Sequence, residues 1–166
     1  MRSESTASPG GSGRMARRIL AVLLLAMAAG QLSDLTGFVD VLQTYELGGR
    51  TIGWLLAIPI VLAEAVAGVG LLRRSGKLRR VGPAVALAVA LAWTALGTQA
   101  FARGLALDNC GCFGVHLAQP LRWWILLEDA EFIALAWWVR RKDLSGPNDR
   151  QPAPVAAETT ATAAQI

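Results

Sequence analysis

Four apolar runs, separated by polar or basic segments, dominate the chain. A membrane-spanning helix needs about 20 mainly apolar residues. These runs are apolar on every face, whereas a helix on a soluble core would alternate apolar and polar stripes. The pattern therefore predicts an all-α polytopic membrane protein, a bundle of four transmembrane helices. We place them at residues 16–32, 52–72, 81–103 and 122–140.

Polar segments rich in Gly, Ser or Pro flank this membrane domain, which we place at residues 16–142. Residues 1–15 and 143–166 carry too few apolar side chains to form a core, so we predict two disordered tails. Composition agrees with a lipid bilayer environment, because 54% of the residues are apolar and only 17% are charged. The net charge of +4 does not indicate nucleic-acid binding, since no basic stripe interleaves with aromatic residues.

The basic residues predict the orientation of the four helices. Thirteen of the 16 Lys and Arg residues lie before the first run, between the second and third, or after the fourth. The other two loops hold only Arg50, Arg103 and Arg122. Because positive residues stay on the cytoplasmic side, we expect both termini in the cytoplasm and the two remaining loops outside a bacterial inner (cell) membrane.

The first run also resembles a signal peptide, since basic residues precede a short apolar stretch and the sequence AMAAG. We expect the first run to be retained as a helix.

The loop after the first run, residues 33–51, carries Leu35, Phe38, Leu42 and Tyr45 at helical spacing. This spacing predicts a short amphipathic helix at the outer membrane face, which either packs against the bundle or contacts a partner.

The chain contains two cysteines, Cys110 and Cys112, in the sequence DNCGCFG after the third run. The predicted outer side is an oxidising environment, where disulfides persist. A crosslink that spans one residue restrains the unfolded chain very little, so a stabilising disulfide is the weaker interpretation. Such a tight ring is strained and easily reduced. We predict a redox pair, with Gly111 supplying the backbone freedom that closure needs.

Metal binding is a third interpretation of the pair, but two thiolates make half a site and His116 would add one ligand. Arg103 and His116 would lower a thiol pKa if they lay close to the pair. The sequence assigns them no role.

Carboxylates inside the predicted helices are candidates for proton handling. Glu64 lies roughly 18 Å from the outer end of the second helix, near mid-membrane, where an acidic group is costly. It is either a protonated acid satisfied by a neighbouring helix or part of a proton relay. Glu128 and Glu131 share a helix face, which we expect to point into the bundle.

Several segments resemble the MauE-type methylamine utilisation membrane proteins, relatives of the DoxX-like four-helix group. They are AAGQLSDLTGF, Tyr45, IPIVLAEAVAGVGLL, ARGLALDNCGCFG and ILLEDAEF, within residues 18–139. The resemblance implies an inner-membrane protein that matures the disulfide-rich small subunit of methylamine dehydrogenase beside a thioredoxin-like partner. Gln31 departs from the pattern, since such proteins tend to carry a lysine there.

Three functions follow as hypotheses. The first is a membrane thiol:disulfide oxidoreductase that uses Cys110 and Cys112 on an exported protein and passes electrons to an acceptor such as a quinone. The second is a non-enzymatic membrane scaffold or chaperone. The third is a DoxX-like respiratory or transport subunit that uses the intramembrane carboxylates.

Overall fold

The computed structural model describes residues 11–145, which form five α-helices and no β-strand. The predicted all-α class is confirmed. The helices are α1 (Gly11–Ser33), α2 (Leu35–Gln43), α3 (Arg50–Leu72), α4 (Lys77–Ala102) and α5 (Trp123–Ser145).

Three of these helices, α1, α3 and α4, are long and apolar enough to cross a membrane. Large side chains such as Val22, Leu62 and Leu91 are more than half exposed on their outer faces, as lipid contact requires. The chain is therefore a polytopic membrane protein. α5 has the length of a span, but Glu128, Asp129 and Glu131 dilute its apolar character. The structure supports three spans, and the fourth crossing stays a prediction.

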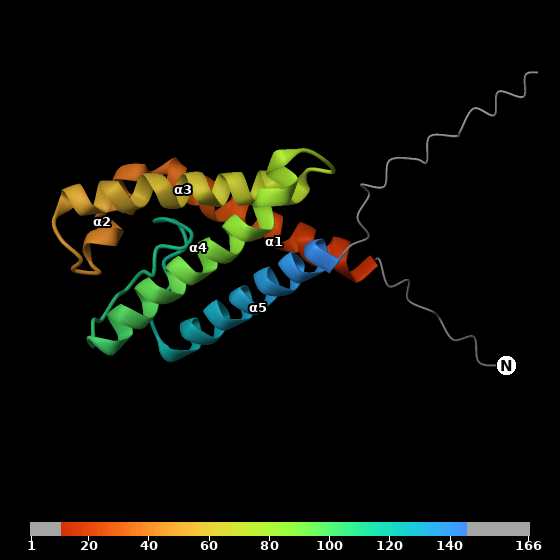
Figure 1. Ribbon diagram of the computed structural model, residues 1–166. Coiled ribbons are helices and arrows are strands. Elements are labelled where there is room, and N and C mark those ends of the chain that lie inside the picture. Colours follow the sequence, from red (N-terminus) through yellow and green to blue (C-terminus); the bar gives the residue numbers. More distant parts are fainter. Residues whose placement is uncertain (1–10, 146–166) are drawn as a thin grey trace, which may run out of the picture.

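The start of α1, the α3–α4 turn and the end of α5 lie at one end of the bundle (Figure 1). Arg17 of α1 joins them, since its guanidinium donates a 2.7 Å hydrogen bond to the carbonyl oxygen of Leu71 and pairs with Asp143 of α5. Segments far apart in the sequence are thereby fixed side by side.

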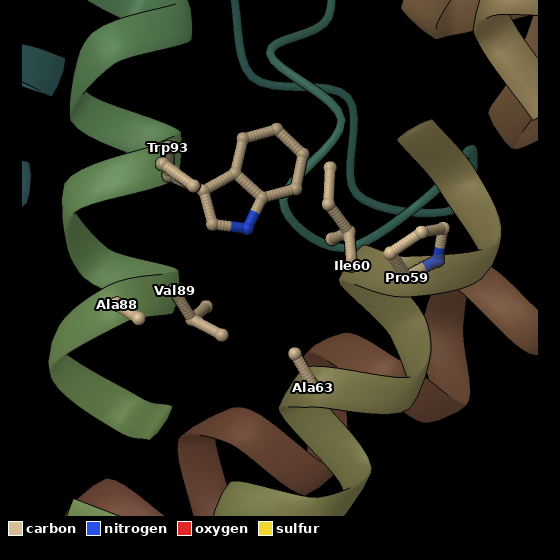
Figure 2. Close-up of a pocket in the computed structure, with 7 residues that line it drawn as sticks. Pro59, Ile60, Ala63, Ala88, Val89 and Trp93 are labelled. Carbon is tan, nitrogen blue, oxygen red and sulfur yellow. The ribbon is translucent and has the colours of Figure 1, made fainter. Parts of the chain in front are cut away.

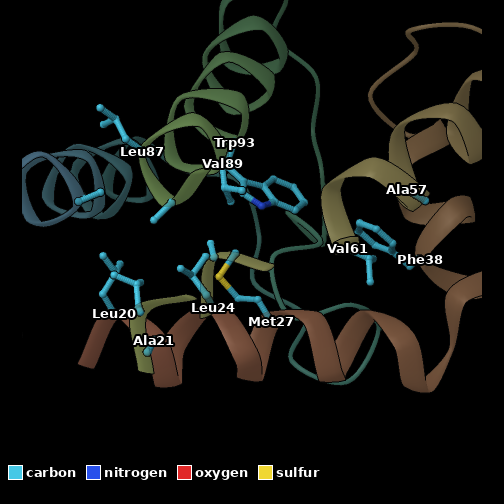
Figure 3. Packing of buried hydrophobic residues seen from close by; sticks show 14 of the residues in the cluster. Leu20, Ala21, Leu24, Met27, Phe38, Ala57, Val61, Leu87, Val89 and Trp93 are labelled. Carbon is cyan, nitrogen blue, oxygen red and sulfur yellow. The ribbon is translucent and has the colours of Figure 1, made fainter. Parts of the chain in front are cut away.

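The core lies between α1, α3 and α4, where apolar side chains converge (Figure 3). Leu20, Leu24 and Met27 of α1 are at most 3% exposed. Glycines let the helices approach closely, as in many membrane bundles. A Cβ on Gly70 would lie 2.9 Å from the Cα of Gly82, so α3 and α4 touch backbone to backbone near their connecting turn.

The predicted amphipathic helix is α2. Asp34 caps it, because its carboxylate accepts a 2.8 Å hydrogen bond from the amide of Gly37. Phe38, Val39 and Leu42 are buried against the rest of the protein. α2 therefore packs against the bundle, as one of the two interpretations of its pattern expected.

The helix bounds differ from the prediction mainly at basic ends. α1 begins at Gly11 and α5 continues to Ser145, so residues 11–15 and 143–145, predicted as parts of the tails, are helical. α4 begins at Lys77 instead of residue 81, and α5 continues through Arg141 and Lys142. Arg and Lys are good helix formers, so charge alone does not end a helix. The remaining predicted tail residues, 1–10 and 146–166, lie outside the described part of the chain.

Candidate functional site

The cysteine loop, which we define as residues 103–122, folds back between the helices after leaving α4 (Figure 1, teal). A Cβ on Gly30 of α1 would lie 2.6 Å from the carbonyl oxygen of Phe113, so the loop rests directly on the α1 backbone. A Cβ on Gly111 would lie 3.5 Å from Phe38 and 3.7 Å from the ring of Trp93. The cysteines thus lie among α1, α2 and α4 instead of on a loop that only follows the membrane surface.

A backbone buried at this depth needs internal hydrogen bonds. The amide of Cys110 donates to the carbonyl oxygen of Gln119 at 2.8 Å, and the amide of Leu121 to that of Leu107 at 2.9 Å. Gly111 has φ +84°, and its amide donates to Oδ1 of Asn109 at 2.9 Å. This left-handed turn brings the two flanking cysteine side chains together.

Cys110 and Cys112 are free thiols whose sulfur atoms lie 3.5 Å apart. Cys110 is 3% exposed and Cys112 is half-buried. A hydrogen bond from Cys112 outweighs the burial of Cys110 and lowers the pKa of Cys110 to about 7. The same hydrogen bond, together with burial, raises the pKa of Cys112. One proton therefore leaves the pair near neutral pH while the second is retained.

Alkylation of the pair is expected to increase with pH around a midpoint near 7, because only the thiolate reacts. Cys112→Ala removes the donor that stabilises the Cys110 thiolate. The midpoint should then move upward, toward the ordinary thiol value of 9.0. Iodoacetamide rates measured across the neutral range on both proteins provide the test, and an unchanged midpoint in the variant would contradict it.

Tyr45 supports the loop from the segment after α2. Its hydroxyl, on a residue 1% exposed, donates a 2.7 Å hydrogen bond to the carbonyl oxygen of Cys110. Burial raises the pKa of Tyr45, so the hydroxyl keeps its proton. Arg103 donates to the Tyr45 carbonyl oxygen and pairs with Glu46 at 2.8 Å, while His116 bonds Oγ of Ser33 at 2.7 Å.

Glu64 has partners on two neighbouring helices. Its Oε1 accepts a 3.3 Å hydrogen bond from Nε2 of Gln31 on α1 and a 2.8 Å bond from the indole of Trp93 on α4. Nε2 of Gln31 also donates to the carbonyl oxygen of Cys112 at 2.9 Å. Gln31 and Glu64 are both 0% exposed. Gln31, absent from the predicted site residues, therefore links Glu64 to the cysteine loop.

The expected direction of Glu128 and Glu131 is wrong. Both are exposed, and Glu128 accepts a 3.1 Å hydrogen bond from Gln119. Asp129, one residue along α5, is 8% exposed and approaches α4, where a Cβ on Gly97 would lie 3.4 Å from its Oδ2. Neighbouring residues on a helix differ in direction by about 100°, so the adjacent carboxylate faces the bundle.

An apolar pocket of about 200 Å³ lies between α3 and α4 (Figure 2). Trp93 is part of its wall and also lies beside Gly111 of the cysteine loop. The residues that line the pocket are Pro59, Ile60, Ala63, Ala88, Val89, Ala92 and Trp93.

Within residues 11–145, no group of three or more His, Cys, Asp or Glu side chains could hold a metal ion.

Comparison with known proteins agrees with the resemblance seen in the sequence. Residues 12–140 match the family described as methylamine utilisation protein MauE. The chain belongs to the MauE family. The match covers all five helices apart from a few terminal residues, and therefore includes both cysteines and Glu64.

A curated relative is the methylamine utilization protein MauE of Paracoccus denitrificans, which is 29% identical over 120 residues. The alignment covers 72% of this chain and 63% of the relative, so the chain spans less than two thirds of that protein's length. No solved structure matches the chain.

Proposed function

We propose that this chain is a membrane thiol–disulfide protein in which Cys110 and Cys112 exchange a disulfide with an exported partner. The observation that carries the proposal is the pair itself, two free thiols 3.5 Å apart on a turn that lies among α1, α2 and α4. The pKa of Cys110, lowered to about 7, supports it further, because acidic thiols are typical of exchange sites.

The exchange begins with the pair oxidised. A thiolate of the partner attacks the sulfur of Cys112, the more exposed of the two, and the Cys110–Cys112 bond breaks. Cys110 leaves readily as a thiolate because of its lowered pKa. A second partner thiolate then attacks the partner's sulfur in the mixed disulfide. The partner leaves with a new disulfide, and two electrons and two protons stay on the pair as two thiols.

Renewed oxidation needs a two-electron acceptor, for which we propose a membrane quinone. The residues that line the pocket between α3 and α4, Trp93 among them, would hold the quinone, which would accept the two electrons and two protons that the dithiol loses when the Cys110–Cys112 disulfide reforms. The apolar pocket supports this acceptor, because the Trp93 ring in its wall also lies beside Gly111 of the cysteine loop.

We place the protein in a bacterial inner membrane with four crossings, cytoplasmic termini and the pair accessible from outside. The joint position of the ends of α1 and α5, together with the basic residues there, supports this topology. The partner is a thioredoxin-like extracytoplasmic protein or an exported substrate. Family membership favours the small subunit of methylamine dehydrogenase as that substrate.

Thiol trapping in intact cells tests the proposal. Cells are treated with a small membrane-impermeant thiosulfonate, with and without a reductant, then quenched in acid and alkylated under denaturing conditions. We expect modification of the pair only after reduction, which places a labile disulfide on the outer side. A pair that stays fully reduced, or that the reagent reaches only in inverted membrane vesicles, would contradict the proposal.

A further inference from the structure

Two buried acceptor atoms beside the cysteine loop have no hydrogen-bond partner, Oε1 of Gln31 and Oε2 of Glu64. Both belong to side chains that are 0% exposed. An unpaired buried acceptor is costly, and in hydrocarbon water does not compensate for it. Two such atoms on side chains that already share a hydrogen bond call for a common explanation.

An ionised carboxylate does not provide that explanation, because it only accepts hydrogen bonds and so does the amide oxygen. A carboxylic acid with its hydrogen on Oε2 satisfies both atoms. Such an acid would donate from Oε2 to Oε1 of Gln31, while Nε2 of Gln31 donates to Oε1 of Glu64 at 3.3 Å. Oε1 of Glu64 accepts hydrogen bonds from the Gln31 amide and the Trp93 indole. Both donors are neutral, so neither supplies a positive charge to balance an ionised Glu64.

We infer that Glu64 is held as a neutral acid in a two-bond ring with the Gln31 amide, and that this acid–amide pair positions Cys112. The link to the loop is the second hydrogen of Nε2, which the Cys112 carbonyl oxygen accepts at 2.9 Å. The pair thereby ties α1 and α3, and through Trp93 also α4, to the redox turn. Gln31 and Glu64 are positioning residues, since neither contacts a sulfur atom in these hydrogen bonds.

Infrared difference spectroscopy of the full chain in lipid nanodiscs tests the protonation state. At neutral pH we expect the carbonyl-stretch band of a protonated carboxylic acid, with a small shift in deuterium oxide. Glu64→Gln should remove this band. Glu131→Gln is the matched control, because it removes an exposed carboxyl and should leave the band in place. A wild-type spectrum without the band, or a band that persists in Glu64→Gln, would overturn the inference.

Thiol reactivity tests the positioning role. Gln31→Leu and Glu64→Leu each remove a link in the chain to Cys112, and the loss of one hydrogen bond should speed alkylation of Cys112 about threefold to tenfold. Glu64→Gln keeps an amide hydrogen for Oε1 of Gln31, so it should give a smaller increase than Glu64→Leu. Gln99→Leu, which alters another glutamine with an unpaired buried oxygen, should match the wild type.

Equal rates in Gln31→Leu and the wild type would overturn the positioning role, and the infrared result still decides protonation if that variant does not fold. That Gln31 and Glu64 assist disulfide exchange rests on the proposed function. The infrared band and the alkylation rate of Cys112 do not depend on it. If the cysteines proved idle in cells, the infrared band and the alkylation rates would be unaffected, so the two failures are distinguishable.

Discussion

Replacing both cysteines with serine is expected to abolish oxidation of the exported partner. A serine hydroxyl stays protonated at neutral pH and forms no disulfide, so neither step of the exchange can occur. The measurement is the fraction of partner that carries its disulfides in a strain lacking the native gene and expressing each variant. A double variant that supports partner oxidation as well as the wild type would leave the scaffold hypothesis standing instead.

Variants that lack one cysteine test which of the two sulfur atoms the partner attacks. In Cys110→Ala the more exposed sulfur remains, and its thiolate can attack the disulfide of an oxidised partner, the reverse of the proposed exchange, releasing one partner thiolate. No neighbouring thiol is left to resolve the mixed disulfide, which should therefore accumulate at Cys112. Cys112→Ala leaves only Cys110, which is 3% exposed, and should trap much less. Non-reducing gels of acid-quenched cells give both yields, and the complex should disappear on reduction. Equal yields would contradict the assignment of Cys112 as the attacked sulfur.

Much of the fold could be predicted because it depends on local pattern. Apolar runs of sufficient length predict α1, α3 and α4, and the spacing of Leu35, Phe38 and Leu42 predicts α2. The Cys-Gly-Cys sequence also marks the candidate redox pair without a structure. The sequence pattern does not show how deeply a loop is buried among the helices. The cysteine loop is buried through contacts with Gly30 and Trp93, and sequence spacing does not show that such distant residues meet.

Because sequence spacing does not show which residues meet in space, it also did not predict which carboxylate of α5 faces the bundle. A helix of 3.6 residues per turn separates adjacent side chains by about 100°, and the EDAE segment of α5 has acids in several directions. The shared face of Glu128 and Glu131 was therefore predictable, but which face meets α4 depends on packing, and Asp129 occupies it. Gln31 did carry a signal. A lone amide inside an apolar run usually has a polar partner, and here that partner is Glu64.

A single methyl group at Gly30 is expected to displace the cysteine loop. The Cβ of an alanine there would lie 2.6 Å from the carbonyl oxygen of Phe113 and 3.1 Å from its carbonyl carbon. These are backbone atoms, which cannot turn away as a flexible side chain would, so the loop or α1 must move. Overpacking of this kind costs about 1–3 kcal/mol. The adjacent Gln31–Cys112 hydrogen bond should weaken with it.

The expected result for Gly30→Ala is a lower melting temperature in detergent together with faster alkylation of Cys112, since the loop lifts from the helix that covers it. Gly13→Ala provides the matched control on the same helix, because a Cβ there would meet nothing within 4 Å. Alanine also favours a helix over glycine by roughly 0.8–1 kcal/mol, so this variant should melt no lower than the wild type. Equal melting and equal alkylation in the two variants would mean that the loop does not rest on α1, and the contacts that define the candidate site would have to be abandoned.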